Sequence, residues 1–544
     1  MTLGATRAPN QAFEIGRATA KELAAVGINW NFAPVLDVIT EQDGTGPSVR
    51  SFGDDPQNVG RFGQAFTEGL RAGGIASCAK HFPGTPKAIR ESVSANRTME
   101  ELEATELVPF RRAVSSGLDS VRLSSSLWTE NPQDPLYPKY MVHEVLRRQI
   151  GYEGVVLGNC TDVPSFRENS NISQATVGAL KAGCDMIMLL HNFETQKHGI
   201  EAIYDGLRRE EILRSEIYRA SGRISMLKEH YLHWKMALSP TPQSLPSLMH
   251  DHQILARKVY EAAITVVRDE HCLLPLSLKL STTDTVLLLT PVVRPLHPTP
   301  PGELPTDPFE PLGRALARRH PRIRHAPYTI QGILPLHASL IKRAAAVIFV
   351  TVNALQTPQQ AYQIRMAEAV KQICGSKPFV ALAACDPYDL LSARPFGTYL
   401  CTYEYSQAAL ETAAAVVFGE RHAPGALPVG TPGVPVRRQQ KQWFVEVWEK
   451  RKDLYASADL WKDCLGKKWP LDASTLSTLL DRPGYSKHFV VRNPVTHELL
   501  GLATTYTIML GPNQLIGSLA LLIVRPTHRL ARRTPYPTFH GNNL

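Results

Sequence analysis

The first part of the chain repeats one unit, in which an amphipathic helix ends in glycine and a short apolar strand follows. Five such strands occur in order: INWNFAPVL, IASCAKHF, DSVRLSS, YEGVVLG and CDMIMLL. Strands this apolar are typical of parallel sheets covered by helices on their faces. The repeat therefore predicts an α/β fold that begins with an incomplete TIM-like (β/α) barrel.

Length and composition bound the possible functions. With 544 residues the chain is too long for one core, and its net charge of +9 is spread along the sequence. We therefore do not expect a nucleic-acid partner. No apolar run reaches about 18 residues, and the N-terminus lacks the apolar core of a signal peptide. These features predict a soluble, cytoplasmic protein without a membrane partner.

The cysteines and histidines give no sign of a metal or redox site. The eight cysteines form no CxxC pair, which indicates reduced thiols. No cluster of histidine, cysteine and aspartate has the spacing of metal ligands. We therefore expect neither a metal ion nor a cofactor.

Changes in composition divide the chain into segments. A proline- and serine-rich linker at 238–250 follows the barrel, and the proline-rich stretch VPVRRQQKQ follows a second α/β region. The tail has no periodicity, so it is expected to be disordered. The predicted parts are a barrel at 1–237, an α/β sandwich at 250–435, an α+β segment at 443–529 and a disordered tail at 530–544.

Polar residues follow the predicted strands at their carboxyl ends, where the active site of a (β/α) barrel lies. Asp37 follows NFAPVL, Lys80 and His81 follow IASCA, Ser124–Ser126 follow SVRL, and Asn159 follows GVVLG. One such residue is more often a solvated loop group than part of a site. Four in the same topological place favour a site.

Several motifs resemble the catalytic barrel of family 3 glycoside hydrolases, on the β-N-acetylglucosaminidase side. They are INWNFAPVLDV, RSFGDDP, KHFPG, YEGVVLGN and AGCDMIM, in the family's order, and KPFVALAACDPYDLL resembles its C-terminal sandwich. The resemblance implies that Asp37, Arg50, Lys80 and His81 bind an N-acetylglucosamine-containing sugar. Charged and bidentate groups suit a polyhydroxylated ring.

The same resemblance puts the chemistry in doubt. The family's mechanism is retaining and needs an aspartate nucleophile and a separate acid. Asn159 stands at the nucleophile position and Val93 at the acid position. An amide is a far poorer nucleophile than a carboxylate, and valine has no proton to transfer. Glu91 is a possible substitute acid, whereas Asp162 lies about a turn too far along the loop to replace the nucleophile. We expect hydrolysis to be weak or absent.

Residues 443–529 resemble the front half of a GNAT-type N-acetyltransferase. The loop that holds the pyrophosphate of acetyl-CoA in that family contains glycines, whereas RPTHRLARRTPYP has none and contains prolines. We therefore do not expect acetyl-CoA to bind. An orphan α+β appendage is the alternative interpretation.

Three hypotheses remain open at this point. The chain is a family 3 glycosidase with impaired catalysis, a non-catalytic N-acetylglucosaminide-binding or scaffold protein, or a truncated bifunctional glycosidase–N-acetyltransferase. The family barrel has two further βα units before the region that matches, and the sequence does not supply them. Which sugar and linkage are involved is not determined by the sequence.

Overall fold

A computed structural model of the chain forms two compact units, Met1–Val434 and Pro435–Leu544. Each unit is described by itself. The structure describes residues 1–39, 48–84, 98–124, 137–159, 172–189, 192–232, 245–296, 306–356, 359–392, 396–430, 444–465, 471–482, 485–492, 499–511 and 514–525.

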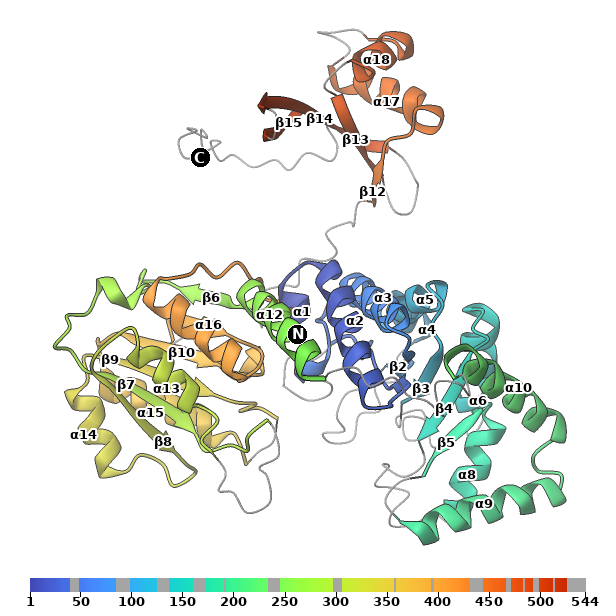
Figure 1. Cartoon of the computed structure of the whole chain (residues 1–544), viewed down its shortest axis with the longest axis horizontal. Coiled ribbons are helices and arrows are strands. Elements are labelled where there is room, and N and C mark those ends of the chain that lie inside the picture. The colour runs from blue at the N-terminus through green and yellow to red at the C-terminus, as the bar shows by residue number, and fades with distance from the viewer. Residues whose placement is uncertain are drawn as a thin grey trace. The chain divides into compact units, whose positions relative to one another are not determined.

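The first sheet is a curled, five-stranded parallel sheet (Figure 1). Its strand order, β1-β2-β3-β4-β5, is the order along the chain. This is expected when a helical connection places each strand parallel to and beside the preceding strand. The predicted incomplete TIM-like barrel is confirmed. Its strands are β1 (Trp30–Asn31), β2 (Ala76–Phe82), β3 (Ser120–Leu123), β4 (Val155–Asn159) and β5 (Met186–Met188).

The first strand is shorter than the apolar run INWNFAPVL predicts. Only Trp30 and Asn31 pair regularly with β2, and an isolated bridge from Val35 to Lys80 continues the contact. Pro34 interrupts regular pairing, because it restricts the backbone of Ala33 before it and has no N–H to donate. The chain still follows β2 as far as Asp37.

Helices cover the outer face of this sheet, and local sequence sets where several of them begin. The Asp55 side chain accepts the Asn58 N–H at 2.7 Å to cap one helix, and Thr98 and Glu101 form a capping box on the next. The helical segments are α1 (Thr2–Ala5), α2 (Pro9–Ala25), η1 (Ser48–Arg50), α3 (Pro56–Ala72), α4 (Met99–Ala104), α5 (Leu107–Ser115), α6 (Tyr137–Tyr140), the π-helical η3 (Met141–Gln149), α8 (Ile172–Lys181), α9 (Phe193–Arg208) and α10 (Arg214–Tyr231).

The second sheet has six strands in the order β6-β11-β10-β9-β7-β8, parallel except for β6 against β11. Strands β7 and β9 are buried along their whole length, as their apolar sequences predict. The edge strands β6 and β8 were not predicted, because RHAPY and TVVRD are too polar to read as buried strands. The strands are β6 (Thr265–Asp269), β7 (Val286–Pro291), β8 (Ile323–Tyr328), β9 (Ala346–Thr351), β10 (Phe379–Ala383) and β11 (Thr398–Cys401).

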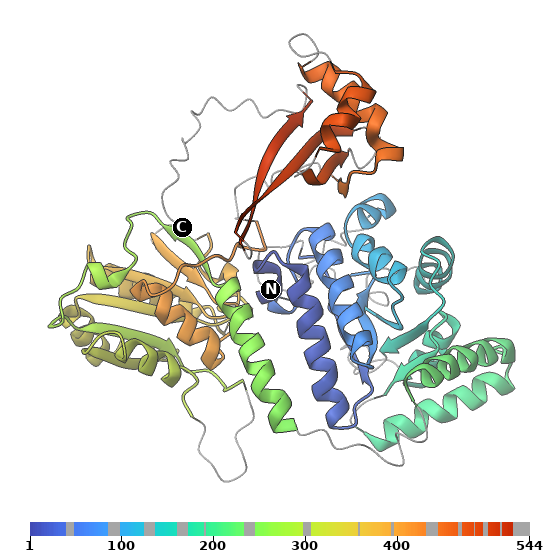
Figure 2. The same cartoon turned by 45° about the horizontal axis from the view of Figure 1, so that its top comes forward.

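Helices on both faces complete an α/β sandwich, as predicted. The predicted linker at 238–250 is wrong in its second half, because a helix begins at Leu245 and packs beside α2 (Figure 2). Pro246 stands in the first turn of that helix, where proline is tolerated because its missing N–H would have no partner within the helix, and Val259 and Ala263 near the other end are buried. The helical segments are α12 (Leu245–Ala263), η4 (Leu276–Leu278), α13 (Glu310–Ala317), α14 (Pro335–Arg343), α15 (Tyr362–Cys374), η5 (Pro387–Asp389) and α16 (Gln407–Phe418).

The C-terminal unit is a four-stranded antiparallel sheet with two helices, which confirms the partial α+β, GNAT-like prediction. Its core includes Leu460, Trp461, Val490, Leu502 and Ile523. The segment after Arg525, which is predicted not to bind acetyl-CoA, and the tail at 530–544 lie outside the described residues. The elements are β12 (Phe444–Val447), α17 (Lys450–Leu465), α18 (Ala473–Leu480), β13 (Tyr485–Arg492), β14 (Leu499–Gly511) and β15 (Gln514–Val524).

Candidate active site

The carboxyl edge of the first sheet brings several predicted site residues together. Lys80 and His81 lie in β2, and Asp37 lies two residues after the Val35–Lys80 bridge. Asn159 ends β4, and Ser124 follows β3 with its N–H donating to the Phe82 carbonyl at 2.7 Å. Because parallel strands end at the same edge, these positions share one rim of the half-barrel.

Asp37 and His81 form the clearest contact at this rim. The His81 Nδ1 lies 2.8 Å from Oδ2 of Asp37, and the His81 backbone N–H points at Oδ1 from 3.4 Å. Asp37 is 1% exposed, and the His81 side chain is 16% exposed. The carboxylate therefore fixes the imidazole ring, and the ring stays open to solvent on one side.

Arg50 is held near Asp37 by the next residue in the chain, Ser51. The Ser51 hydroxyl donates to the Asp37 carbonyl at 2.7 Å and so holds the two loop segments together. Arg50 itself is exposed, and its charge is close enough to act on Lys80. The four predicted binding residues, Asp37, Arg50, Lys80 and His81, are thus neighbours.

Lys80 has charged neighbours of both signs. Burial lowers the pKa of its ammonium group, and the charges of Arg122 and Arg50 lower it further, whereas Cys78 and Asp37 act in the opposite direction. Arg122 was not predicted as a site residue. The signal was a single charged residue inside the otherwise buried strand SVRL, directly opposite Lys80 in the ladder between β2 and β3.

The backbone places Asn159 near this group. Strand β3 alone lies between β2 and β4, so the two strands that hold Lys80 and Asn159 are about 10 Å apart. Asn159 is the Cα partner of Met188 at the end of β5. Lys80 and Asn159 therefore do not lie on opposite sides of the barrel. Glu91, Val93, Asp162, Ser125 and Ser126 fall outside the described residues, so their assigned positions stay predictions.

A bonded carboxylate–imidazole pair beside an ammonium group offers both hydrogen-bond acceptors and charged donors. Such a set can hold several hydroxyl groups of one ligand at once. In the described part of the chain, no group of three or more histidine, cysteine, aspartate or glutamate side chains could hold a metal ion. Among the described helices, none is both long and apolar enough to cross a membrane.

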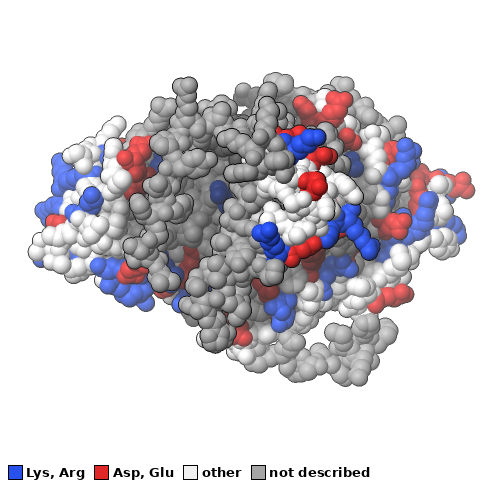
Figure 3. All heavy atoms as spheres, turned by 90° about the horizontal axis from the view of Figure 1, so that it is seen from above, with Lys and Arg blue, Asp and Glu red and all other residues white. Residues whose placement is uncertain are grey.

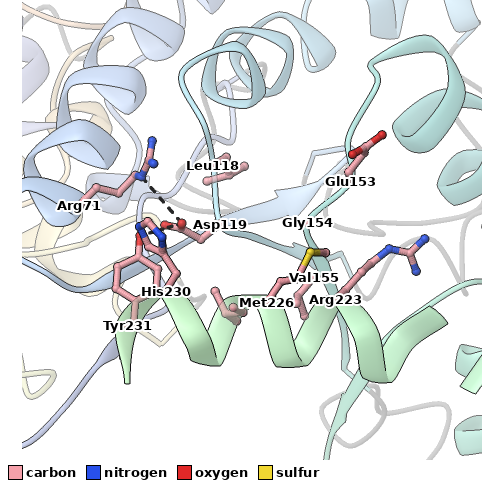
Figure 4. A pocket seen from close by; sticks show the side chains of 11 residues that line it. Arg71, Leu118, Asp119, Glu153, Gly154, Val155, Arg223, Met226, His230 and Tyr231 are labelled. Carbon is pink, nitrogen blue, oxygen red and sulfur yellow. Dashed lines mark hydrogen bonds and ion pairs between the residues drawn. The ribbon is translucent and has the colours of Figure 1, made fainter. Parts of the chain in front are cut away.

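A pocket of about 230 Å³ lies at the opposite, amino-terminal edge of β3 and β4, under helix α10 (Figure 4). One of its two carboxylates, Asp119, accepts the Ser77 N–H at 2.9 Å, the Ser77 hydroxyl at 2.7 Å and the Tyr231 hydroxyl at 2.7 Å. Burial and this carboxylate raise the pKa of Tyr231. These donors already occupy the Asp119 carboxylate. We therefore interpret the pocket as part of the packing contact between α10 and the sheet, in which Tyr231 bonds to Asp119.

Charged side chains on the face drawn in Figure 3 are of both signs and interspersed among the described residues. This distribution agrees with the spread of charge along the sequence. The described residues on that face therefore form no single-sign surface that would compete with the rim of the half-barrel as a candidate site.

Comparison with known proteins gives a family to the N-terminal part. The model of the glycosyl hydrolase family 3 N-terminal domain matches residues 1–227. A β-hexosaminidase of Tolumonas auensis is 34% identical over 216 residues, which cover 39% of this chain and 63% of the relative. A β-hexosaminidase of Haemophilus influenzae is 28% identical over 44% of this chain and 68% of its own length. The chain thus spans about two thirds or less of these relatives.

Solved structures extend the likeness beyond the barrel. A fungal multi-domain family 3 β-N-acetylglucosaminidase with a GCN5-related glucosamine N-acetyltransferase region is 30% identical, with a TM-score of 0.72. The match covers 97% of this chain and 61% of that one. A family 3 β-N-acetylglucosaminidase of Paenibacillus is 25% identical with a TM-score of 0.66, over 79% of this chain and 82% of that one. Residues 1–227 thus match the N-terminal domain of glycosyl hydrolase family 3, and the chain as a whole is similar to family 3 β-N-acetylglucosaminidases, one of which carries an acetyltransferase region.

Proposed function

We propose that the rim formed by Asp37, Arg50, Lys80 and His81 binds a sugar that contains N-acetylglucosamine, and that hydrolysis at this site is weak or absent. The observation that supports binding is the 2.8 Å contact between His81 and the buried Asp37, next to Lys80. The buried carboxylate holds the His81 ring in one orientation, and the exposed side of that ring is available for a sugar hydroxyl.

The proposal of weak hydrolysis depends on residue identity. Asn159 ends β4 at the position where the family's nucleophile is expected, and an amide cannot replace a carboxylate in that role. Val93 at the proposed acid position has no transferable proton, and loss of acid catalysis normally costs 10²–10⁴-fold, roughly. The proposed activity is therefore that of a family 3 glycosidase with impaired turnover.

Binding and turnover are to be measured on the same preparations. We expect N-acetylglucosamine to bind to the wild-type chain in titration calorimetry, and Asp37→Ala to weaken that binding by about 10-fold or more, since a charged hydrogen-bond partner is lost. Asp205→Asn is the matched control, because this carboxylate is exposed on α9 and lies outside the rim. Equal binding by wild type and Asp37→Ala would contradict the assigned site.

Turnover is tested with an aryl N-acetylglucosaminide, whose activated leaving group needs less protonation. We expect wild type to be near background and Asn159→Asp to recover little, since valine still occupies the acid position. Robust wild-type hydrolysis that persists in Asn159→Ala would show that another carboxylate acts as nucleophile. That outcome would overturn the proposal of impaired catalysis and leave the binding site in place.

A further inference from the structure

One side of helix α9, which lies at the outer edge of the half-barrel, carries large apolar side chains that are exposed (Figures 1 and 2). Phe193 is 75% exposed, Tyr204 61% and Ile200 54%. Ala202 and Gly206 are buried on the opposite side, and the helix packs against α8. Scattered single apolar residues are normal on a protein surface, whereas several gathered on one helix face indicate a contact with another molecule.

Two exposed cations complete a row on this side of the helix. At 3.6 residues per turn, the five side chains of the row fall within about 80° of one another and extend over about 22 Å of the helix axis. This α9 row consists of Phe193, Lys197, Ile200, Tyr204 and Arg208. Lys197 lies 4.0 Å from Glu201, and Arg208 lies 3.2 Å from Asp205. Exposed ion pairs of this kind are weak, so both cations can also contact a second molecule.

The order of side chains in the α9 row is complementary to the same order reversed. When two copies pair antiparallel about Ile200, Phe193 of one copy lies opposite Arg208 of the other, and Lys197 lies opposite Tyr204. Each cation then meets an aromatic ring, which is a favourable contact, and the two-fold axis repeats both contacts. A parallel pairing in register would instead place Lys197 on Lys197 and Arg208 on Arg208, and these charges repel.

The exposed area of the α9 row sets the strength of such a contact. Because an aromatic side chain buries about 150–250 Å² when it is fully covered, the exposed parts of the two rings and of Ile200 offer roughly 300–400 Å² per copy. The aliphatic stems of Lys197 and Arg208 add to this area. Interfaces that bury less than about 1,200 Å² from both partners together are typical of weak, reversible complexes. The α9 row therefore suits a reversible association.

We propose that the α9 row is a self-association surface, through which two copies of this chain form a reversible, antiparallel homodimer with two-fold symmetry. A second copy is the occupant because the row pairs aromatic rings with cations only when it meets its own reversed order. The inference goes beyond the proposed function and does not depend on it, since none of the rim residues Asp37, Arg50, Lys80 and His81 belongs to the row.

Sedimentation velocity of the full chain tests the association over about 1 to 200 µM, the range in which contacts of this size associate. We expect the sedimentation coefficient to rise with concentration from monomer towards dimer. Ile200→Ser should weaken the dimer by about 10-fold or more, since both copies lose the central apolar side chain. Lys197→Glu should weaken it as well, whereas Lys197→Arg should retain it. Leu336→Ser is the matched control, because this side chain is 64% exposed on α14 of the sandwich.

Cysteine cross-linking tests the orientation, in a Cys272→Ser background because the native Cys272 thiol is exposed. Ile200→Cys should form a disulfide between copies under mild oxidation. Phe193→Cys should not, since antiparallel pairing separates these two positions by about 22 Å along the axis. Cross-linking of Phe193→Cys without Ile200→Cys would contradict the antiparallel orientation. A monomer at every concentration, or a dimer that folded Ile200→Ser and Lys197→Glu proteins form as readily as wild type, would overturn the proposal.

Discussion

Buried titratable side chains give this protein its strongest residue-level constraints. Asp389 is 3% exposed and lies in η5, between β10 and β11 of the second sheet, where its carboxyl group accepts the Ala354 N–H at 2.6 Å. Burial first, and the neighbouring charge of Asp386 second, raise its pKa to about 8. At neutral pH the folded state therefore holds this proton, which the unfolded chain releases near pH 4.

The first prediction concerns the pH dependence of stability. Between the unfolded pKa near 4 and the folded pKa of about 8, the folded state binds more protons, so stability should fall as pH rises. Asp389→Asn should flatten this dependence by about 1–3 kcal/mol across the window. Urea denaturation of both proteins at pH 5 and pH 8, followed by circular dichroism, measures the difference. Parallel pH profiles for the two proteins would contradict the assignment.

At the scale of elements, the helix pair α2 and α3 shows how small residues set the geometry around the half-barrel. A Cβ on Gly69 would meet the Phe13 carbonyl oxygen at 2.2 Å, and one on Gly16 would meet the Phe66 carbonyl oxygen at 2.5 Å. The two helices can approach this closely only because both positions lack a side chain. They lie side by side in Figure 2.

The second prediction tests this close approach. Gly69→Ala should destabilise the N-terminal unit by about 1–3 kcal/mol, the usual cost of overpacking, because backbone atoms cannot move aside easily. Gly178→Ala in α8 is the matched control, since its Cβ would meet nothing within 4 Å. Replacing that glycine should stabilise the helix by up to about 1 kcal/mol. Thermal unfolding that moves in the same direction for both variants would disprove the packing argument.

At the scale of the first unit, residues 426–430, which follow the last helix of the sandwich, form hydrogen bonds with the half-barrel part of the chain. Gly430 donates its N–H to Asp54 at 2.5 Å, and Asp54 donates its N–H to the Pro428 carbonyl at 3.2 Å. Ala426 donates to the Ala5 carbonyl at 3.0 Å. Burial raises the pKa of Asp54, and the hydrogen bond from Gly430 opposes that rise. One carboxylate thus links residues 376 positions apart in the chain.

The third prediction concerns this joint. Asp54→Ala should lower the stability of the first unit by about 1.5–3 kcal/mol, as expected for a hydrogen bond to a charged group. It should also make the half-barrel and the sandwich unfold less cooperatively, which broadens or splits the calorimetric transition. Asp205→Asn, an exposed carboxylate, should leave the transition unchanged. A single sharp transition in Asp54→Ala would mean that the apolar contacts alone couple the two parts.

The sequence by itself determined the local units and most of the candidate residues. Helices that end in glycine and short apolar strands predicted the parallel sheet, and KHFPG placed Lys80 and His81 at a strand end. These features follow from local physics, because period, apolar content and capping act over a few residues. The sequence also suggested, from Asn159 alone, that nucleophilic catalysis is impaired.

Tertiary structure decided what depends on contacts between distant segments. His81 reaches Asp37 across 44 residues, and Arg122 joins the site only because β3 pairs in register with Lys80. The polar edge strands β6 and β8, and the helix that begins at Leu245 within a proline-rich stretch, are likewise fixed by their neighbours. Which segments pair depends on the burial and hydrogen bonding of the whole fold. A local sequence pattern covers only a few residues and therefore does not determine it.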